Sequence, residues 1–333
     1  MTKNTKKKTV VIFRFSAFGD VAMTVPVIRE FLIQNPEVEI LYVSREKFQP
    51  LFDSLPNFRF FPADLDGKHK GIPGLFRLAK DLKKESIFAV ADLHNVLRTK
   101  ILCFFLSKFP TAVLDKARKE RKNLIQQKNK IKKPLKPMTE RYADVFRDLG
   151  FELNLSHQLT SKEIPLENAV GIAPFALHPG KMFPIEKMKS IALKLAEKGI
   201  KVYLFGGGTK EKEELEKWEK LHSNLESVVG KLDLQAELQL IKKLKVMISM
   251  DSANMHLASL VGTPVLSIWG TTHPFMGFLG YGQSMENVIQ DESLTIRPTS
   301  VFGKEPKHLE GFDYFKNISE EIVLDKIEAI LFS

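Results

Sequence analysis

The sequence predicts an α/β protein with two doubly wound domains, each a parallel sheet covered by helices on both faces. Short, continuous apolar runs alternate with longer segments of helical periodicity, which is the pattern of strands buried on both faces. A basic, proline-containing stretch near the middle interrupts this alternation, which then resumes. The 333 residues, of which 44% are hydrophobic, are enough for two cores.

The first half of the chain predicts an N-terminal domain over 1–160. Its strands are expected at 9–15, 38–43, 58–61, 87–92 and 111–114. Its helices are expected at 21–34, 75–84, 96–106 and 139–149. The basic and proline-containing stretch lies before the last of these helices, and the polar stretch 156–163 is interpreted as the connection to the second domain.

The second half predicts a C-terminal domain over 161–315. Its strands are expected at 170–173, 201–205, 227–229, 246–250 and 264–269. The first helix begins after Pro184, because proline suits a first helical turn, and further helices follow the next strands. A final helix is predicted at 318–331. For the segment 316–333, crossing back to the N-terminal domain is one option.

The composition excludes several classes of protein. No stretch reaches the roughly 18 uninterrupted apolar residues of a membrane-spanning helix. The N-terminal stretch Met1–Lys8 contains no apolar signal region, so we expect no export. The single cysteine, Cys103, excludes an internal disulfide and fits a reducing cytosol.

The net charge of +10 indicates an anionic partner, such as a nucleic acid, a phosphorylated substrate or a membrane surface. A basic run contributes strongly to this charge: Lys116–Lys122, Lys128–Lys133 and Lys136, with Glu120 as its only acid. Two interpretations stay open. The run is either a solvated loop or a surface that meets phosphates, because such attraction is electrostatic and needs little geometry.

Sheets of this kind bind ligands at the carboxyl ends of their strands, so the loops that follow the strands are the candidates for chemistry. The first of these loops, Phe15–Asp20, leads into a helix, and Gly19 permits a tight turn there. Asp20 is either a cap of that helix or a general base. The loop lacks the G-x-G-x-x-G spacing of a dinucleotide site.

Two loops of the second half carry weaker signals. Pro179 and Gly180 shape a turn that presents Lys181 at a strand end, where it is either a solvated lysine or a phosphate contact. Gly206–Gly208 follows the next strand and permits close approach of a ligand to the backbone. Without a following Gly-Lys-Ser/Thr it is not a P-loop.

The strongest signal is the stretch Asp251-Ser-Ala-Asn-Met-His-Leu-Ala258, which lies between two apolar runs. The strand delivers Asp251 to the sheet edge, and a helix begins at Ser252, so the free N–H groups of Ala253, Asn254 and Met255 form an anion site. His256 lies one turn after Ser252 on the same side. Each residue alone favours a cap or a core position, but their joint placement favours diphosphate binding.

With these loops in view, the chain resembles the family-nine glycosyltransferases, the heptosyltransferases that build the lipopolysaccharide core. The resemblance covers nearly the whole chain. The motifs that carry it are Arg14-Phe-Ser-Ala-Phe-Gly-Asp-Val21 with Pro26, Asp92-Leu-His-Asn-Val-Leu-Arg98, Asp251-Ser-Ala-Asn-Met-His-Leu-Ala258, Gly262-Thr-Pro-Val265 and Gly270-Thr-Thr-His-Pro274.

The resemblance implies the GT-B fold, with two Rossmann-like domains facing each other across a cleft. It implies an inverting transfer without a metal or other cofactor. The C-terminal domain would hold a nucleotide-diphosphate sugar, typically ADP-heptose, and Asp20 would be the general base. Lys181 and the amides of Ser252 and Ala253, aided by His256, would neutralise the leaving diphosphate, a contribution of roughly 3–4 kcal/mol per donor in comparable sites.

The resemblance also assigns two sets of binding residues. The donor would contact Lys181, Glu211, Leu232, Asp251, Ser252, Ala253, Asn254 and His256. The acceptor would contact Ser16, Phe18, Gly19, Asn95, Arg98, Lys100, Arg118 and Arg121.

The sequence departs from the family pattern at several of these positions. Phe183 stands where the family often has tryptophan, and Ser252-Ala253 where it often has a threonine–glycine pair. Glu211 is the best match for the ribose-binding glutamate, and Leu232 is expected to pack on the base. The identity of the heptose is therefore the weakest implication.

The expected partners are the nucleotide sugar and an anionic, lipid-linked sugar acceptor, with no nucleic acid. The acceptor would be met by Arg98, Lys100 and the basic run, in a cytoplasmic monomer that is peripheral to the inner membrane. Alternatives are a nucleotide-sugar epimerase of the same fold, a basic nucleic-acid-binding protein, and a catalytically silent homologue.

Overall fold

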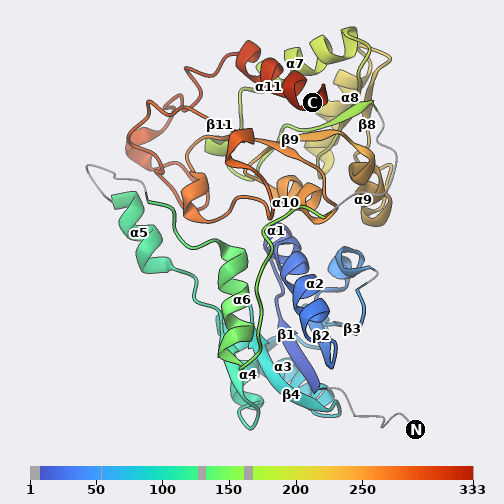
Figure 1. Cartoon of the computed structure of the whole chain (residues 1–333), viewed down its shortest axis with the longest axis vertical. Helices are drawn as coiled ribbons and strands as arrows, with labels where there is room; N and C mark the ends of the chain where they lie inside the picture. The colour runs from blue at the N-terminus through green and yellow to red at the C-terminus, as the bar shows by residue number, and fades with distance from the viewer. Residues whose placement is uncertain (1–7, 54, 127–132, 161–167, 333) are drawn as a thin grey trace. The chain divides into compact units, whose positions relative to one another are not determined.

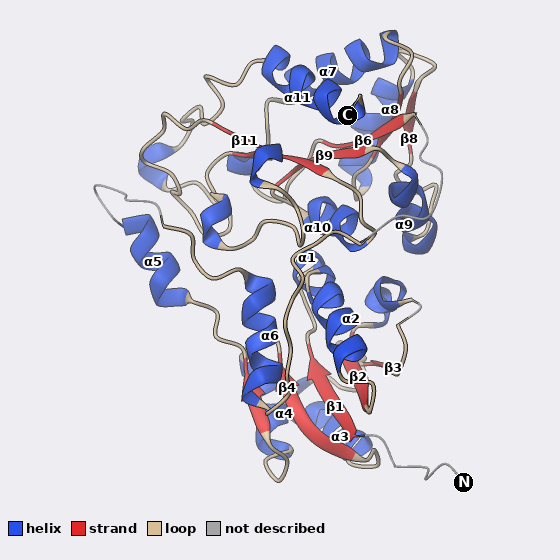
Figure 2. Cartoon of the chain, viewed as in Figure 1, coloured by secondary structure: helices blue, strands red, loops and turns tan. Residues whose placement is uncertain are grey.

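The computed structural model describes residues 8–53, 55–126, 133–160 and 168–332. The chain divides into two compact units (Figures 1 and 2). The N-terminal unit consists of Met1–Lys116 and Met138–Ser156, and the C-terminal unit consists of Ala117–Pro137 and His157–Ser333.

The N-terminal unit is built on a parallel sheet with the strand order β3-β2-β1-β4-β5. Its strands are β1 (Lys8–Phe13), β2 (Val38–Ser44), β3 (Phe58–Pro62), β4 (Ile87–Asp92) and β5 (Thr111–Val113). Its helices are α1 (Phe18–Ala22), α2 (Thr24–Gln34), the 3-10 helix η1 (Glu46–Phe52), α3 (Gly71–Leu82), α4 (Leu97–Phe105) and α6 (Met138–Asp148).

Alternation along β1 separates the two faces of this sheet. Val11 and Phe13 point to the core that α3 and α4 cover, where Leu78 and Leu102 are fully buried. Helices α2 and α6 pack against each other on the opposite face, in front of the sheet in Figure 1. Because both faces are covered, the strands are apolar along almost their whole length.

The C-terminal unit is built on a second parallel sheet with the order β11-β10-β9-β6-β7-β8. Its strands are β6 (Ala169–Ala173), β7 (Lys201–Leu204), β8 (Leu225–Ser227), β9 (Val246–Met250), β10 (Val265–Trp269) and β11 (Val288–Gln290). Its α-helices are α5 (Arg118–Gln126), α7 (Ile185–Glu197), α8 (Thr209–Glu219), α9 (Leu234–Lys243), α10 (Ala253–Leu260) and α11 (Glu320–Leu331). Its 3-10 helices are η2 (Pro179–Lys181), η3 (Pro274–Met276), η4 (Met285–Asn287) and η5 (Lys307–Leu309).

Helices α7, α8 and α11 cover one face of this second sheet. Their apolar side chains, among them Leu195, Trp218 and Ile327, share a core with Ile172 and Ile248 of the central strands. Helix α10 packs on β9 and β10, and α9 packs on α10. The arrangement is doubly wound, so the predicted fold class of two parallel-sheet α/β domains is confirmed.

Each sheet has one point where the strand order reverses. The chain moves from β1 outward to β2 and β3, and then returns to place β4 on the other side of β1. In the C-terminal unit the chain likewise moves from β6 outward to β7 and β8, and then returns to place β9 on the other side of β6. The loops after β1, β4, β6 and β9 therefore diverge at the points where doubly wound sheets bind ligands.

The predicted boundaries need four corrections. The predicted helix 21–34 is two helices, α1 and α2, with Pro26 in the first turn of α2, where its missing N–H is tolerated. The short strand β11 was not predicted. Part of the basic run is the helix α5 and not a loop, because Lys, Arg and Glu are strong helix formers. This helix also belongs to the C-terminal unit and not to the predicted N-terminal domain 1–160.

The final helix needs a further correction. Helix α11 does not cross back to the N-terminal unit, because Val323, Ile327 and Leu331 are buried in the C-terminal core. Some predictions fall outside the described residues: the absence of a signal region in 1–7, the lysines at 128–132 of the basic run, and the part of the connection at 161–163.

Candidate functional site

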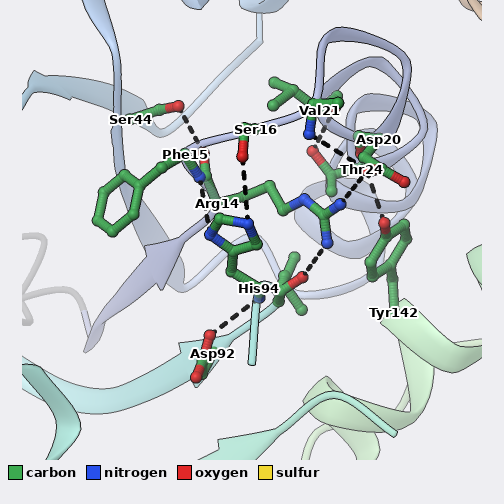
Figure 3. A network of polar contacts seen from close by, with 12 residues as sticks. Arg14, Phe15, Ser16, Asp20, Val21, Thr24, Ser44, Asp92, His94 and Tyr142 are labelled. Atoms are coloured by element: carbon green, nitrogen blue, oxygen red, sulfur yellow. Dashed lines mark hydrogen bonds and ion pairs between the residues drawn. The ribbon is translucent and has the colours of Figure 1, made fainter. Parts of the chain in front are cut away.

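The loop after β1 is anchored by Arg14, a buried arginine at the reversal point of the N-terminal sheet. Its guanidinium donates to the carbonyl of Leu93 in the loop after β4, at 2.7 Å. The same group forms an ion pair with Asp20 at 2.5 Å and lies 5.8 Å from the centre of the Tyr142 ring. Arg14 therefore joins the loops after β1 and β4 and fixes the carboxylate of Asp20 at the start of α1 (Figure 3).

The carboxylate of Asp20 is held through only one of its two oxygens. Oδ2 accepts from Arg14 and, at 3.2 Å, from the backbone N–H of Ala17, the residue before α1. Among the described residues no hydrogen bond or ion pair reaches Oδ1, and the side chain is 31% exposed. Asp20 thus supports the start of α1, as the cap interpretation expects, and still presents an open oxygen that can accept a proton.

The loop after β4 is organised by Asp92 and His94. Oδ1 of Asp92 accepts from the backbone N–H groups of His94 and Asn95, at 2.9 and 2.8 Å. Nδ1 of His94 lies 3.4 Å from the backbone nitrogen of Phe15, and Nε2 lies 3.4 Å from Oγ of Ser16. Burial lowers the pKa of His94 to about 3, with Arg14 and Lys116 adding to the effect, so the imidazole is neutral near pH 7.

The predicted acceptor residues of the N-terminal unit lie around this network. Ser16 is exposed beside His94, Gly19 is half-buried at the start of α1, and Phe18 packs edge-on against Phe48. Asn95 adopts a φ of 47° and donates to the carbonyl of Leu114. The remaining two, Arg98 and Lys100, are exposed on the first turns of α4.

Arg118 and Arg121 are not part of the N-terminal unit, in contrast to the predicted N-terminal domain 1–160, and their contact with the acceptor stays a prediction. Both belong to α5 of the C-terminal unit. Arg118 is exposed, but Arg121 is buried, donates to the carbonyl of Met276 at 3.3 Å and lies 4.2 Å from the centre of the Phe278 ring. Arg121 therefore packs α5 against its own unit.

At the reversal point of the C-terminal sheet, Lys181 meets Asp251. Nζ of Lys181 lies 2.7 Å from Oδ2 of Asp251 and donates to the carbonyl of the same residue at 3.1 Å. Oγ1 of Thr272, in the loop after β10, donates to the same carboxylate oxygen at 2.8 Å. Both charged side chains are largely buried, so the loops after β6, β9 and β10 converge on one ion pair.

Helix α10 starts immediately beyond this pair. Ser252 is its N-cap residue in an extended conformation, but its side chain makes no capping hydrogen bond and instead contacts Oγ of Ser249 at 3.1 Å. Ala253 and Asn254 are half-exposed. The first turn therefore presents uncapped N–H groups next to a lysine, which is a suitable environment for an anion.

His256 lies one turn after Ser252 on α10 and is buried. The two interpretations of this residue, a core histidine or a phosphate contact, therefore both remain, and its role in donor binding stays a prediction.

Glycines bring the loops of this site into contact. A Cβ atom on Gly270 would lie 2.2 Å from the carbonyl oxygen of Gly180, and one on Gly303 would lie 2.5 Å from Cε of Lys181. The backbone N–H of Thr271 donates to the carbonyl of Gly180 at 2.8 Å. Close backbone contact of this kind fixes the position of Lys181.

The other two predicted donor residues follow the next strands of the sheet, β7 and β8. Glu211, in the first turn of α8, accepts from the backbone N–H of Gly207 at 2.7 Å, so it closes the Gly206–Gly208 turn. Leu232 is 37% exposed just before α9. The predicted donor residues thus follow strands β9, β6, β7 and β8. These strands span three strand spacings, roughly 15 Å, a length suited to an extended nucleoside diphosphate.

Several residues of the two networks were not predicted. Arg14 and His94 stand in the quoted motifs, but their contacts join segments 79 residues apart. Arg297 is fully buried and donates to the carbonyls of Trp269 and Thr272 at 3.1 and 2.8 Å, which fixes the end of β10. No local pattern around Arg297 signals this role.

The described residues include neither a candidate metal site nor a candidate membrane-spanning helix. Within residues 8–53, 55–126, 133–160 and 168–332, no cluster of three or more His, Cys, Asp or Glu side chains is placed to hold a metal ion. The described helices also include none with the length and apolar character needed to cross a membrane.

The chain is similar in sequence to known glycosyltransferases. Residues 75–299 match the model of glycosyltransferase family 9 (heptosyltransferase), a range that includes the C-terminal network but begins after Asp20. The chain is 25% identical over 284 residues to the lipopolysaccharide core heptosyltransferase OpsX of Haemophilus influenzae, covering 80% of each protein. It is 25% identical over 353 residues to lipopolysaccharide heptosyltransferase 1 of Campylobacter coli, covering 96% of this chain and 98% of that protein.

Solved structures show the same fold. The crystal structure of a family 9 glycosyltransferase from Veillonella parvula aligns with a TM-score of 0.74 and 21% identity, over 98% of this chain and 97% of that one. The Escherichia coli heptosyltransferase WaaC with ADP aligns with a TM-score of 0.70 and 19% identity, over 97% of this chain and 99% of that one.

Proposed function

The chain belongs to glycosyltransferase family 9, the heptosyltransferases, and from this premise we propose that it transfers a heptose from ADP-heptose to a lipopolysaccharide core acceptor. That it is a glycosyltransferase follows from the family and from the relatives named lipopolysaccharide heptosyltransferases. The choice of donor is supported by the WaaC structures, which contain ADP and ADP-2-deoxy-2-fluoro heptose.

One observation carries the donor half of this proposal: the uncapped first turn of α10 begins beside Lys181 at the reversal point of the sheet. Backbone N–H groups and a lysine at such a point together offer hydrogen bonds and positive charge to a diphosphate. Glu211 and Leu232 then extend the site along β7 and β8 toward the ribose and the base. Asp251 holds Lys181 in place through the ion pair.

Asp20 supplies the base for the acceptor half. Arg14 and the N–H of Ala17 fix Oδ2, so Oδ1 is the oxygen that accepts a proton. As the acceptor hydroxyl gives this proton to Asp20, its oxygen forms a bond to the anomeric carbon. The bond from that carbon to the diphosphate oxygen breaks on the opposite face, and the nucleoside diphosphate leaves with the electron pair, which inverts the configuration.

The residues around the diphosphate act on the charge that develops as this bond breaks. Lys181 and the N–H groups of Ser252 and Ala253 would each stabilise the leaving group, by roughly 3–4 kcal/mol per well-placed donor. We propose that these donors suffice without a metal or other cofactor, as the family resemblance implies.

On the acceptor side, Ser16 and Asn95 lie in the loops after β1 and β4, and Arg98 and Lys100 lie on the first turns of α4, where these two exposed cations suit a phosphorylated sugar. A lipid-anchored acceptor is presented at a membrane surface. We therefore place the protein at the inner face of the cytoplasmic membrane, whose anionic lipids attract a chain of net charge +10.

The test is a panel of nucleotide sugars with a purified lipid A–core acceptor, with release of nucleoside diphosphate as the readout. The proposal predicts release only when ADP-heptose and acceptor are both present. Conversion of the donor sugar in the absence of acceptor would instead identify an epimerase. Release from a different nucleotide sugar would overturn the choice of donor while leaving the transferase assignment intact.

A further inference from the structure

Helices α3 and α4 expose an unusual number of large apolar side chains, although they cover a well-packed core on their inner side. Phe76 is 56% exposed on α3, and Phe104 is 73% exposed on α4. The two helices pack against each other, and the ring of Phe76 lies 5.5 Å from that of Phe105. The exposed side chains therefore belong to one continuous surface.

We call this surface the α3–α4 face. Its apolar members are Ile72, Phe76, Leu97, Ile101, Phe104 and Phe105. Its exposed cations are Lys70, Arg77, Lys80, Arg98, Lys100 and Lys108. Monomeric proteins rarely expose apolar side chains in such a group unless the group binds something.

The charge around the α3–α4 face is mainly positive. Asp66 attracts Lys70 and Arg98 of the face, but it is already paired with Arg45 at 2.5 Å. From Leu97 to Lys108 the sequence contains three basic residues and no acid. Asp81, the acid within α3, is already paired with Lys68 and Lys84 at 2.8 Å. A second copy of this face would meet it with like charges, whereas a surface with negative charge and an apolar interior matches both of its features.

We propose that the α3–α4 face is a membrane-docking surface, whose aromatic side chains insert into the headgroup region of a bilayer that contains anionic lipid. The basic side chains contact the lipid phosphates, and the rings of Phe76 and Phe104 enter the apolar boundary beneath them. Helix α5, the other basic helix, exposes Arg118, Lys119 and Lys122 but no large apolar side chain among its described residues. The described part of α5 therefore has the positive charge of a membrane-docking surface but not its exposed apolar side chains.

The α3–α4 face adjoins the loop after β4, to which we assign part of the acceptor site. Helix α4 starts at Leu97, directly after the loop that carries Asp92, His94 and Asn95. Docking through α4 therefore brings this loop to the membrane surface, where a lipid-anchored acceptor presents its sugar. Membrane docking rests on the proposed function. Vesicle binding is measured without donor or acceptor, so a chain that fails to bind vesicles could still catalyse the transfer reaction.

The first experiment is sedimentation with phosphatidylcholine vesicles, with and without phosphatidylglycerol. The wild-type chain is expected to bind the anionic vesicles and to be partly released by salt. Replacing both rings, Phe76→Ser with Phe104→Ser, should weaken binding at least about tenfold, because each ring removes apolar area from the contact. The matched control is Ile33→Ser on α2, which is 67% exposed on the opposite helical layer and should bind as wild type.

A second measurement does not depend on the double variant being folded. Both native tryptophans, Trp218 and Trp269, are buried in the C-terminal unit, so Phe104→Trp adds the one exposed indole of the described chain. Its fluorescence should shift to the blue on anionic vesicles and stay unshifted without them.

Unchanged vesicle binding by the double serine variant, or an unshifted emission of F104W on vesicles, would overturn the proposal. Self-association of the wild type that the double variant abolishes would overturn it in favour of a second copy of the chain.

Discussion

Nζ of Lys181 lies 2.7 Å from Oδ2 of Asp251, so the cation that we assign to the donor diphosphate already has a buried partner. The pair holds the lysine at the reversal point of the sheet before any donor binds. The loops after β6, β9 and β10 therefore depend on the same ion pair for their position. Lys181 therefore has two roles: it stabilises the fold through Asp251, and we propose that it binds the donor diphosphate. Substitutions can test the two roles separately.

Replacing the lysine tests both roles. Lys181→Met leaves the buried carboxylate of Asp251 with only Thr272, which should lower the free energy of unfolding by about 3 kcal/mol or more. Loss of a charge-assisted hydrogen bond should also weaken ADP binding roughly 10–100-fold. Urea denaturation and titration calorimetry measure the two effects.

A double variant provides the control for this prediction. Lys181→Met with Asp251→Asn removes both charges, so stability should largely return while ADP binding stays weak. If the double variant bound ADP as tightly as the wild type, Lys181 would have no part in holding the diphosphate.

Asp20→Asn tests the base. The amide can no longer accept the proton of the acceptor hydroxyl, so turnover should fall by roughly 10²–10⁴-fold. ADP affinity should be unchanged, because Asp20 belongs to the other unit. The matched control is Asp66→Asn, since Asp66 is also paired with an arginine, Arg45, at 2.5 Å but lies outside the network. Near-normal turnover of the Asp20 variant would remove this residue from the mechanism.

His94 gives the fold a specific acid sensitivity. Its pKa is about 3 in the folded protein, against roughly 6.5 in the unfolded chain, so below pH 6.5 only the unfolded chain takes up this proton. The free energy of unfolding should therefore fall by about 1.4 kcal/mol per pH unit as the pH drops from 6.5 to about 3.

The variant for this prediction is His94→Gln, whose amide can keep the contacts with Phe15 and Ser16 but does not titrate. Between pH 7 and pH 5 the wild type should lose about 2 kcal/mol more stability than the variant in urea denaturation. Equal losses in the two proteins would show that His94 is not held neutral by the fold.

Gly270→Ala tests the close contact that fixes Lys181. The added Cβ would lie 2.2 Å from the carbonyl oxygen of Gly180 and 2.6 Å from Cζ of Phe315. The resulting backbone shift should cost roughly 1–3 kcal/mol of stability and should weaken ADP binding. Gly207→Ala is the stability control, because its Cβ would meet no atom within 4 Å. A Gly270 variant as stable as this control would argue against the contact.

The parts of the structure that local patterns specify could be predicted. The strand β9 and the start of α10 follow from an apolar run, an acid and a cap residue next to one another in the sequence. The same holds for the alternation of strands and helices in both units, because burial on both faces makes each strand continuously apolar.

The contacts that complete the two networks could not be predicted. Arg14 reaches Leu93, and His94 reaches Ser16, only because the sheet places β1 beside β4. The burial of Arg121 depends on α5 packing against its own unit, whereas the sequence shows only its charge. Such contacts are set by tertiary packing and leave no periodic signal in the chain.

The most direct test of the donor site is a crystal structure of the protein with ADP. The diphosphate is expected to lie against the backbone N–H groups of Ser252 and Ala253, with Nζ of Lys181 within hydrogen-bond distance of a phosphate oxygen. The adenosine is expected to extend along the ends of β7 and β8. A diphosphate bound away from the start of α10, with Lys181 still paired only with Asp251, would contradict this expectation.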